Sequence, residues 1–532
     1  MICSSRSSSR PISCPVRRAT TFAPWDISEP PPCTIRTCGS LPHEGGGSND
    51  GQQRFESGTI HQGGGNAKAP PNRKWEAFSN YAQSRRQLLR SLFGGIGSLG
   101  LAGILSRDSA LGGAEPAAGH YPGPRTPGKA RHVISLLLSG GPSHVDLFDP
   151  KPALLDHQGE RPDAVDLRTE RQTGGLLATP FEFRQHGASG IAVSEIIPQL
   201  ASVIDGLCVI RSMYSFNPTH TPALSLWHTG TVLLNRPSIG SWVSYGLGSE
   251  NENLPTFVAL GGAGGSSART GFLPAEHQGT PINSAETDPV NMIPDLQNRW
   301  ADREAQRRQL DALQELNRDF GRSFGGDEFL EGRIQAMETA YRMQFAALDA
   351  FDVRHEPESI REEYGTGQFA NGCLLARRLV ERGVRYVHVG SGGWDNHKDL
   401  EQNYRKNCPA MDQAAAALIR DLKRRGLLDE TIVIWGGEFG RTPVSESGTG
   451  RDHNPYGYTM WVAGGGFRGG LAYGATDEFG FKAIENRVSI HDLHATILYA
   501  LGMDHTRLTY RYAGRDFRLT DVSGEVVQGL LA

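Results

Sequence analysis

The sequence predicts an α/β protein, with a central, mostly parallel sheet sandwiched by helices and with a helical insertion. Two amphipathic helical stretches, 369–383 and 411–428, each lead into an apolar, β-rich run, at 384–389 and 431–435. This alternation at short spacing is typical of right-handed crossovers between parallel strands. The chain of 532 residues, 38% of them hydrophobic, is long enough to bury a large core.

Three earlier apolar runs are expected to be strands of the same sheet. They are HVISLLLSGG (132–141), VIDGLCVIRSM (203–213) and FVALGG (257–262). Residues 289–355 differ from them, because Arg, Glu, Gln, Ala and Leu recur there at helical spacing, and we interpret this stretch as the helical insertion. No purely apolar run of a length that spans a bilayer occurs, so we expect no permanent membrane span.

The N-terminal part has a different composition. Residues 1–80 are rich in Ser, Gly, Pro and Arg, which predicts a disordered leader. Arg85 and Arg86 then precede a mildly apolar, Gly-rich stretch, a pattern typical of a twin-arginine export signal; the alternative is an amphipathic surface helix. We therefore assign 81–120 to the signal and a linker and 121–532 to the mature domain. The expected partner is the twin-arginine machinery, and the expected location is periplasmic or extracellular.

Charge and cysteine content exclude several functions. The formal net charge of −4 does not indicate a nucleic-acid-binding surface, and we expect no nucleic-acid partner. The cysteines of the expected mature domain are dispersed and lack CxxC spacing, which argues against a disulfide framework and a Cys-based zinc site. They are Cys208, Cys373 and Cys408.

Three polar clusters border predicted strands in the C-terminal half. GGWDNHKD (392–399) and GGEFGRTP (436–443) follow strands, whereas GRDHNP (450–455) precedes one at 458–464. Open α/β sheets bind ligands outside the carboxyl ends of their strands. Clusters of Asp, Glu and His at such ends are where a hydrolytic metal site is expected.

Asp395 and His397 are the first candidate metal ligands. In an extended segment, residues two apart point the same way, so both could face one ion; the alternative is a loop Asp that caps a helix beside a surface His397. In the third cluster we expect a loop in which His453 is a ligand and Asp452 is its hydrogen-bonding partner or a second ligand. The alternative there is a plain turn.

Glu438 and Arg441 are the candidates of the second cluster. Glu438 could be a further ligand, and Arg441 could bind anionic ester oxygens in bidentate fashion; the alternative is an ion pair between them that braces the turn. After the first strand, GGPSHVDLFDPKP (140–152) offers Asp146 as the preferred further ligand.

The segment NPTHTPALSLWHTG (217–230) predicts a turn that opens a helix, and a helix N-terminus favours an anion. Thr219 or Thr221 could be nucleophiles, and His220 a base or a ligand. For Thr221, a role as helix cap is the stronger interpretation.

The strings HVISLLLSGGPSHVDLFDPKP, GWDNH, GEFGRTP and RDHNP, in this order, resemble the exported bacterial family known as domain of unknown function 1501, over roughly 130–521. The wider resemblance is to the alkaline phosphatase–sulfatase superfamily, which implies an alkaline-phosphatase-like fold. HTPALSLWHTG (220–230) has the spacing of the sulfatase signature, and TIVIWGGEFG (431–440) is similar to a strand that supplies metal ligands there.

The chain departs from that superfamily at several positions. The aspartate of the first strand is displaced, and Ser139, Gly140 and Gly141 stand at the strand end. His220 occupies the place of the residue that sulfatases convert to formylglycine, which argues against that chemistry. Glu438 stands where a metal-binding Asp is expected, and Phe439 stands where its His partner is expected. The resemblance therefore implies one retained metal position, formed by Asp395, His397 and His453, and a second that is altered.

These observations predict an exported, metal-dependent hydrolase of phosphate or sulfate esters. Its substrate would be an anionic ester in a small molecule or a polysaccharide, and its cofactor a divalent metal, zinc first, with manganese, calcium or magnesium as alternatives. The second hypothesis is a non-catalytic exported binding or scaffold protein on the same fold, because the nucleophile is missing and Phe439 could plug the site. Convergence of the candidate ligands in the structure would favour the hydrolase, and a dispersed or plugged arrangement would favour the second hypothesis.

Overall fold

The computed structural model describes residues 128–532, except 166–167, 234, 262–265, 295, 299 and 324–327. The expected leader, the expected twin-arginine segment and the expected start of the mature domain near Tyr121 lie outside the described residues.

The described strands are β1 (His132–Leu138), β2 (Phe183–His186), β3 (Ile191–Ser194), β4 (Leu207–Tyr214), β5 (Phe257–Leu260), β6 (Thr280–Ile282), β7 (Tyr386–Ser391), β8 (Thr431–Gly436), β9 (Gly440–Glu446), β10 (Gly450–Asn454), β11 (Tyr458–Ala463), β12 (Leu471–Tyr473), β13 (Ala475–Thr476), β14 (Ala483–Glu485), β15 (Val488–Ser489), β16 (Tyr510–Tyr512) and β17 (Arg515–Phe517). The α-helices are α4 (His144–Leu147), α5 (Ala153–Asp156), α6 (Pro198–Ala201), α7 (His220–Thr229), α8 (Ile239–Leu247), α9 (Pro289–Met292), α10 (Arg303–Ser323), α11 (Glu328–Ala350), α12 (Glu358–Tyr364), α13 (Gln368–Val380), α14 (Leu400–Arg424) and α15 (Ile490–Ala500). Short 3-10 helices lie at Asp163–Val165, Ile204–Gly206, Ala275–His277, Val353–His355, Leu428–Glu430 and Gln528–Leu530.

Within the described part of the chain, one large sheet organises the fold. Its nine strands follow the order β12-β4-β11-β8-β1-β7-β5-β6, and β15 pairs with β4. The central strand β1 pairs in parallel with β7 and β8, β5 pairs in parallel with β6 and β7, and only β11 runs antiparallel to its neighbours β4 and β8. The predicted mostly parallel sheet is therefore confirmed.

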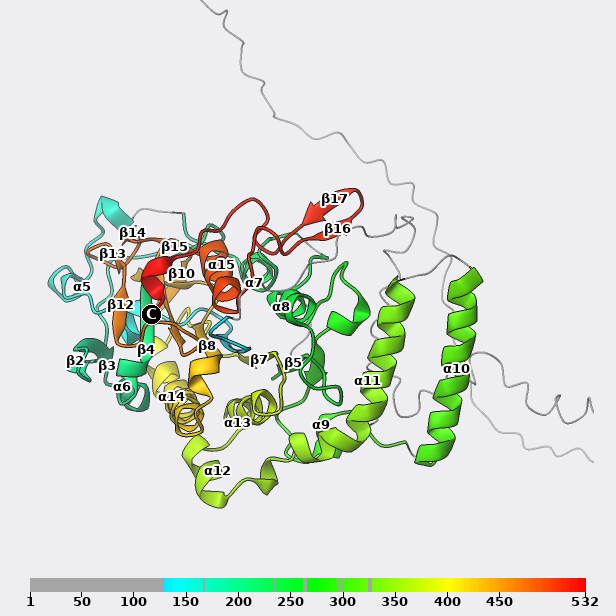
Figure 1. Ribbon diagram of the computed structural model, residues 1–532. Helices are drawn as coiled ribbons and strands as arrows, with labels where there is room; N and C mark the ends of the chain where they lie inside the picture. Colours follow the sequence, from blue (N-terminus) through cyan, green and yellow to red (C-terminus); the bar gives the residue numbers. More distant parts are fainter. Residues whose placement is uncertain are drawn as a thin grey trace, which may run out of the picture. The chain divides into compact units, whose positions relative to one another are not determined.

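Helices cover both faces of this sheet (Figure 1). On β1, Ile134 and Leu136 point into a core shared with α6, α13 and α14, whereas Val133 and Leu137 point into a second core shared with α7, α8 and α15. Successive residues of a strand face opposite sides, so a strand between two helix layers must be apolar throughout. This explains the continuous apolar runs by which the strands were predicted.

Some boundaries differ from those predicted. The run at 203–213 is not strand from its start, because Ile204–Gly206 forms a 3-10 helix and β4 begins at Leu207. The 289–355 stretch contains α9, α10 and α11. No helix among the described residues is long and apolar enough to cross a membrane.

The sheet topology brings the polar clusters to one edge. Because β1, β7 and β8 are parallel neighbours, the segments that follow them end side by side. β4 has the same direction as β8, since both are antiparallel to β11, so α7 also begins at this edge. The third cluster precedes its strand because β11 runs the opposite way. It lies on β10, which pairs with β9 in a separate two-stranded sheet.

Gly140 fixes the distance between the end of β1 and the segment after β7. Its φ is +119°, and a Cβ atom there would overlap the backbone of Trp394 and Asp395. We expect Gly140→Ala to cost more stability than Gly159→Ala, which has φ +84° but open space around it and so bears only the positive-φ cost of about 1–2 kcal/mol. Chemical denaturation of both variants checks this, and equal losses would contradict it.

Candidate metal centre

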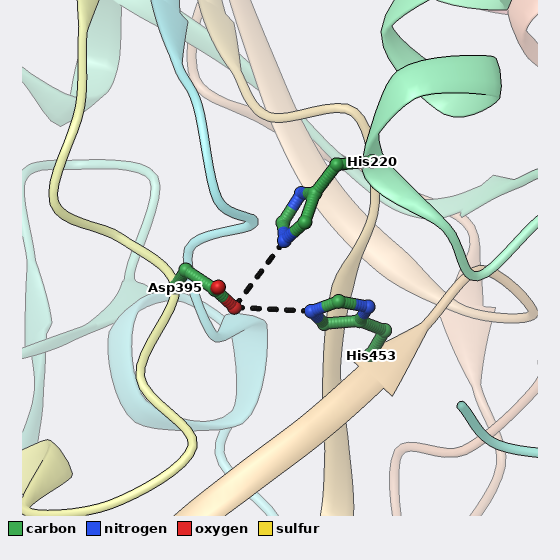
Figure 2. A group of neighbouring side chains, drawn as sticks. All are labelled: His220, Asp395 and His453. Carbon is green, nitrogen blue, oxygen red and sulfur yellow. Dashed lines mark hydrogen bonds and ion pairs between the residues drawn. The ribbon is translucent and has the colours of Figure 1, made fainter. Parts of the chain in front are cut away.

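Three histidines converge on one carboxylate oxygen at this edge of the sheet. The Nε2 atoms of His397, His453 and His220 lie 2.8, 3.0 and 3.3 Å from Oδ1 of Asp395. Figure 2 shows His220, at the start of α7, and His453, on β10, approaching the same oxygen of Asp395. The ligand atoms of this trio all lie within 4.8 Å of one another, as do those of a second trio formed by His397, Asp452 and His453. The described residues thus contain two overlapping groups that could hold a divalent metal.

The other ring nitrogen of each histidine is held by an oxygen atom. Nδ1 of His220 lies 2.7 Å from Oε1 of Glu438, and Nδ1 of His397 contacts Oε2 of Glu446. Nδ1 of His453 lies 2.6 Å from the carbonyl oxygen of Pro218 and 2.6 Å from Oε2 of Glu170. Such outer contacts fix the tautomer and orientation of metal-binding imidazoles. Here they point the three Nε2 atoms toward Asp395.

The charges around Asp395 keep it ionised. Burial by itself would raise its pKa, but the Arg441 guanidinium, which donates to Oδ1, outweighs burial and holds the pKa of Asp395 well below the usual range. Burial, followed by the positive charge of Arg441, lowers the pKa of His453 to about 3. A carboxylate beside a neutral imidazole is the protonation state that metal binding requires.

The cluster combines buried aromatic neighbours with partly exposed ligand side chains. The ring of Phe439 is buried and lies 5.0 Å from the His220 ring and 4.5 Å from the His453 ring, centroid to centroid. Trp394 is also buried and packs on Tyr404. The Asp395 side chain, in contrast, is 47% exposed and that of His220 is 30% exposed. Neither aromatic residue therefore covers Asp395.

Two expected roles are corrected by the structure. Arg441 does not face a substrate, because its side chain is fully buried and donates to the carbonyl oxygens of Gly140 and Gly141 and to Oδ1 of Asp395, at 2.6 Å. Asp146 is not among the converging ligands. It is fully buried in an ion pair with Arg451, with Oδ2 2.8 Å from Nε. Both residues brace the fold beneath the cluster.

Glu438 and Asp452 lie behind the imidazoles. The Glu438 carboxylate accepts the backbone N–H of Gly140 and contacts His220, and it belongs to neither trio. Asp452 is buried on β10 and its two oxygens accept the backbone N–H groups of His453 and Arg171, at 2.8 and 2.7 Å. The expectation of a loop at Asp452 and His453 was wrong, because these residues pair with β9.

The threonines beside His220 are exposed. The N-cap of α7 is Thr219, without a side-chain cap hydrogen bond, so the expectation that Thr221 caps the helix was wrong. Among the hydrogen bonds of the described residues, none joins either threonine hydroxyl to Asp395 or to the three histidines. Their expected role as nucleophiles therefore has no support from a contact.

Sequence reasoning missed Glu446 and Glu170, which contact His397 and His453. Glu446 lies eight residues after Glu438, at the end of β9. The sequence of a strand does not show which imidazole one of its side chains will contact. Only the pairing of β9 with β10, with its irregular register between Arg451 and His453, brings Glu446 to the site.

Glu438→Gln tests the support given to His220. Glutamine keeps the size and one oxygen that can take the place of Oε1, but it lacks the negative charge and is therefore a weaker acceptor for the His220 N–H. We expect metal affinity to fall by about 10–100-fold with little change in folding. Competition with a chromophoric chelator measures this. Glu160→Gln is the matched control, because Glu160 forms the same contact with His157, at 2.8 Å, on the exposed surface.

The fold and this cluster define a class: an α/β protein with a histidine–carboxylate centre at the edge of a mostly parallel sheet. The chain belongs to the family described as protein of unknown function (DUF1501), whose model matches residues 130–531. No protein with curated function matches the chain.

Several solved structures are similar to the chain over most of its length. The PsFucS1 sulfatase from Pseudoalteromonas sp. is 13% identical, with a TM-score of 0.33 over 76% of this chain and 72% of that one. The lipoteichoic acid synthase LtaP from Listeria monocytogenes is 12% identical, with a TM-score of 0.31 over 73% and 74%. A TAB5 alkaline phosphatase mutant with Mg bound in its M3 site is 10% identical, with a TM-score of 0.30 over 71% and 100%. At these scores the likeness carries no argument about activity.

Proposed function

We propose that this protein is an exported, metal-dependent hydrolase of phosphate or sulfate esters, with Asp395, His397 and His453 as metal ligands. The observation that carries the proposal is the convergence of two imidazole Nε2 atoms on one ionised, half-exposed carboxylate. The alternative expectation, a site plugged by Phe439 and Trp394, is not favoured, because the Asp395 side chain is 47% exposed.

The residues present fit a divalent transition metal. Nε2 of His397 is buried and forms no hydrogen bond with another described residue, although it lies near Asp395. Imidazole nitrogens with a carboxylate suit zinc or manganese, whereas calcium and magnesium prefer oxygen ligands alone. Zinc is therefore the first expectation, and calcium and magnesium become less favoured than they were from the sequence.

The bound ion would supply Lewis-acid polarisation of the ester and acidification of water. Other residues of the chain hold the candidate ligands in position. Arg441 keeps Asp395 ionised and oriented, Glu446 holds the His397 ring, and Phe439 excludes water from the rear of the His220 and His453 rings. Because Arg441 is engaged with the protein, it would not bind the anionic ester oxygens, and a bound cation would attract them instead.

The substrate and the location belong to the same proposal. An exposed Asp395 admits an ester at the end of a small molecule or of a polysaccharide chain. The Arg85–Arg86 pair supports export through the twin-arginine pathway, which generally moves proteins already folded. A centre filled before export would then act in the periplasm or outside the cell.

The test is metal analysis of the purified mature protein, followed by a screen of phosphate and sulfate esters with native, chelator-treated and zinc- or manganese-restored samples. We expect bound transition metal and ester hydrolysis that disappears on chelation and returns with the metal. Protein without divalent metal would overturn the proposal. Metal without hydrolysis across both ester classes would favour the second hypothesis, an exported binding or scaffold protein.

A further inference from the structure

We propose that His220 is a ligand of the metal ion, which it would bind together with Asp395 and His453, the three residues whose ligand atoms all lie within 4.8 Å of one another. The proposal rests on the metal site of the proposed function and deepens it. It gives a ligand role to the residue that stands where a nucleophile or base was expected from the sequence.

The first argument concerns the capacity of Asp395 Oδ1. A carboxylate oxygen offers about two lone-pair sites. Arg441 Nη2 already donates to Oδ1 at 2.6 Å, yet three imidazole nitrogens also lie within 3.3 Å of it. Because an acceptor oxygen on each Nδ1 fixes the hydrogen there, the Nε2 lone pairs face this carboxylate oxygen with no hydrogen between them. A cation among these atoms accounts for their crowding.

The second argument concerns unpaired buried nitrogens. Nε2 of His220 and Nε2 of His397 are both buried and form no hydrogen bond with another described residue. A buried polar atom without a partner costs about 1–3 kcal/mol, so such atoms mark a missing partner. Both nitrogens lie beside Oδ1 of Asp395, so each lacks a partner on the side that faces this carboxylate.

The spacing suits one tetrahedral ion. Ligand atoms at about 2.0–2.1 Å from such an ion lie roughly 3.3 Å from one another. The distances from Asp395 Oδ1 to Nε2 of His453 and of His220, 3.0 and 3.3 Å, are near this value, and the three ligand atoms all lie within 4.8 Å of one another.

His220 is also oriented as a ligand. Its Nδ1 lies 2.7 Å from Oε1 of Glu438, which is buried and itself anchored by the Gly140 N–H. A carboxylate behind the ring fixes hydrogen on Nδ1 and leaves the Nε2 lone pair facing inward. With both ring nitrogens committed, His220 is a positioning and binding residue rather than a general base.

A second ion on the other trio is disfavoured by its contacts. Asp452 lies 3.9 Å from Nδ1 of His397, the nitrogen that already contacts Glu446. Both oxygens of Asp452 accept backbone N–H groups. The donors of that trio are therefore satisfied by the protein, whereas those around Asp395 are not.

The test uses Co²⁺ as a spectroscopic probe in the metal-depleted protein. The native protein should bind one Co²⁺ per chain with the visible absorption of a four-coordinate site. His220→Ala should lower metal affinity by more than the roughly 10–100-fold typical of an outer residue and change the Co²⁺ spectrum. Added imidazole should restore the spectrum, because the His220 side chain is 30% exposed and its loss leaves a place open to solvent.

His157→Ala is the matched control, since His157 also contacts a glutamate but lies on the surface, and it should bind Co²⁺ as the native protein does. An unchanged affinity and spectrum in His220→Ala, or two ions per chain in the native protein, would overturn the inference. Neither of these results would decide whether the protein hydrolyses esters. Conversely, a protein that binds one four-coordinate ion but cleaves no ester would contradict the proposed function. The assignment of His220 as a ligand would still hold.

Discussion

Replacing Asp395 and His453 together by alanine is expected to abolish both metal binding and ester hydrolysis. The double variant removes the carboxylate on which all the imidazoles converge and the most buried of those imidazoles. The remaining His397 and His220 offer two nitrogens, too few for a protein site of three or four ligands. We expect metal content near zero by elemental analysis and hydrolysis at the level of the chelated native protein.

The control for this experiment is Asp156→Ala with His157→Ala, which removes the same two residue types from the exposed surface near α5. Circular dichroism should show that both double variants are folded. Retention of stoichiometric metal by the Asp395 and His453 variant would place the ion elsewhere. Hydrolysis without metal would show that the activity does not use this centre.

Replacing Arg451 by methionine is expected to destabilise the protein by about 3–5 kcal/mol, because it leaves the fully buried Asp146 carboxylate without its ion partner. The guanidinium of Arg451 also donates to the carbonyl oxygens of Thr442, Pro443 and Leu177, so several acceptors lose their donor at once. The shift of the urea midpoint at constant slope measures the loss.

Two companion variants make the stability result specific. Arg405→Met removes the exposed pair with Glu401 and should change stability by no more than about 1 kcal/mol. Asp146→Asn should cost stability while the metal content stays at the native value, because Asp146 bonds Arg451 and Ser143 rather than an ion. A loss of metal without loss of stability in Asp146→Asn would restore Asp146 as a ligand.

The fold could be predicted because it depends on patterns that are local in sequence. The strand β1 is buried on both faces and therefore reads as an unbroken apolar run, and α13 and α14 each lead directly into the next parallel strand. The convergence of Asp395, His397 and His453 was a reasonable expectation for a similar reason. Strand ends at one edge of a sheet bring their flanking residues together.

The failures have a common physical cause, namely contacts between residues far apart in the chain. Arg441 looked like an anion-binding residue, but the carbonyl oxygens of Gly140 and Gly141, 300 residues away, take its hydrogen-bond donors. Asp146 looked like a ligand, but Arg451 neutralises it. A sequence shows that such residues are polar, and it does not show which partner satisfies each one.

The sequence by itself determined the alternating α/β architecture and the three histidine- or acid-bearing clusters at strand ends, because periodicity and strand-end chemistry are properties of short segments. Only the tertiary structure decided which residues face a common point. It brought His220 beside Asp395 through the shared direction of β4 and β8, and it set Glu438 and Glu446 behind the imidazoles. The identity of each side chain's partner is a property of the packed sheet edge, where segments separated by more than 200 residues meet.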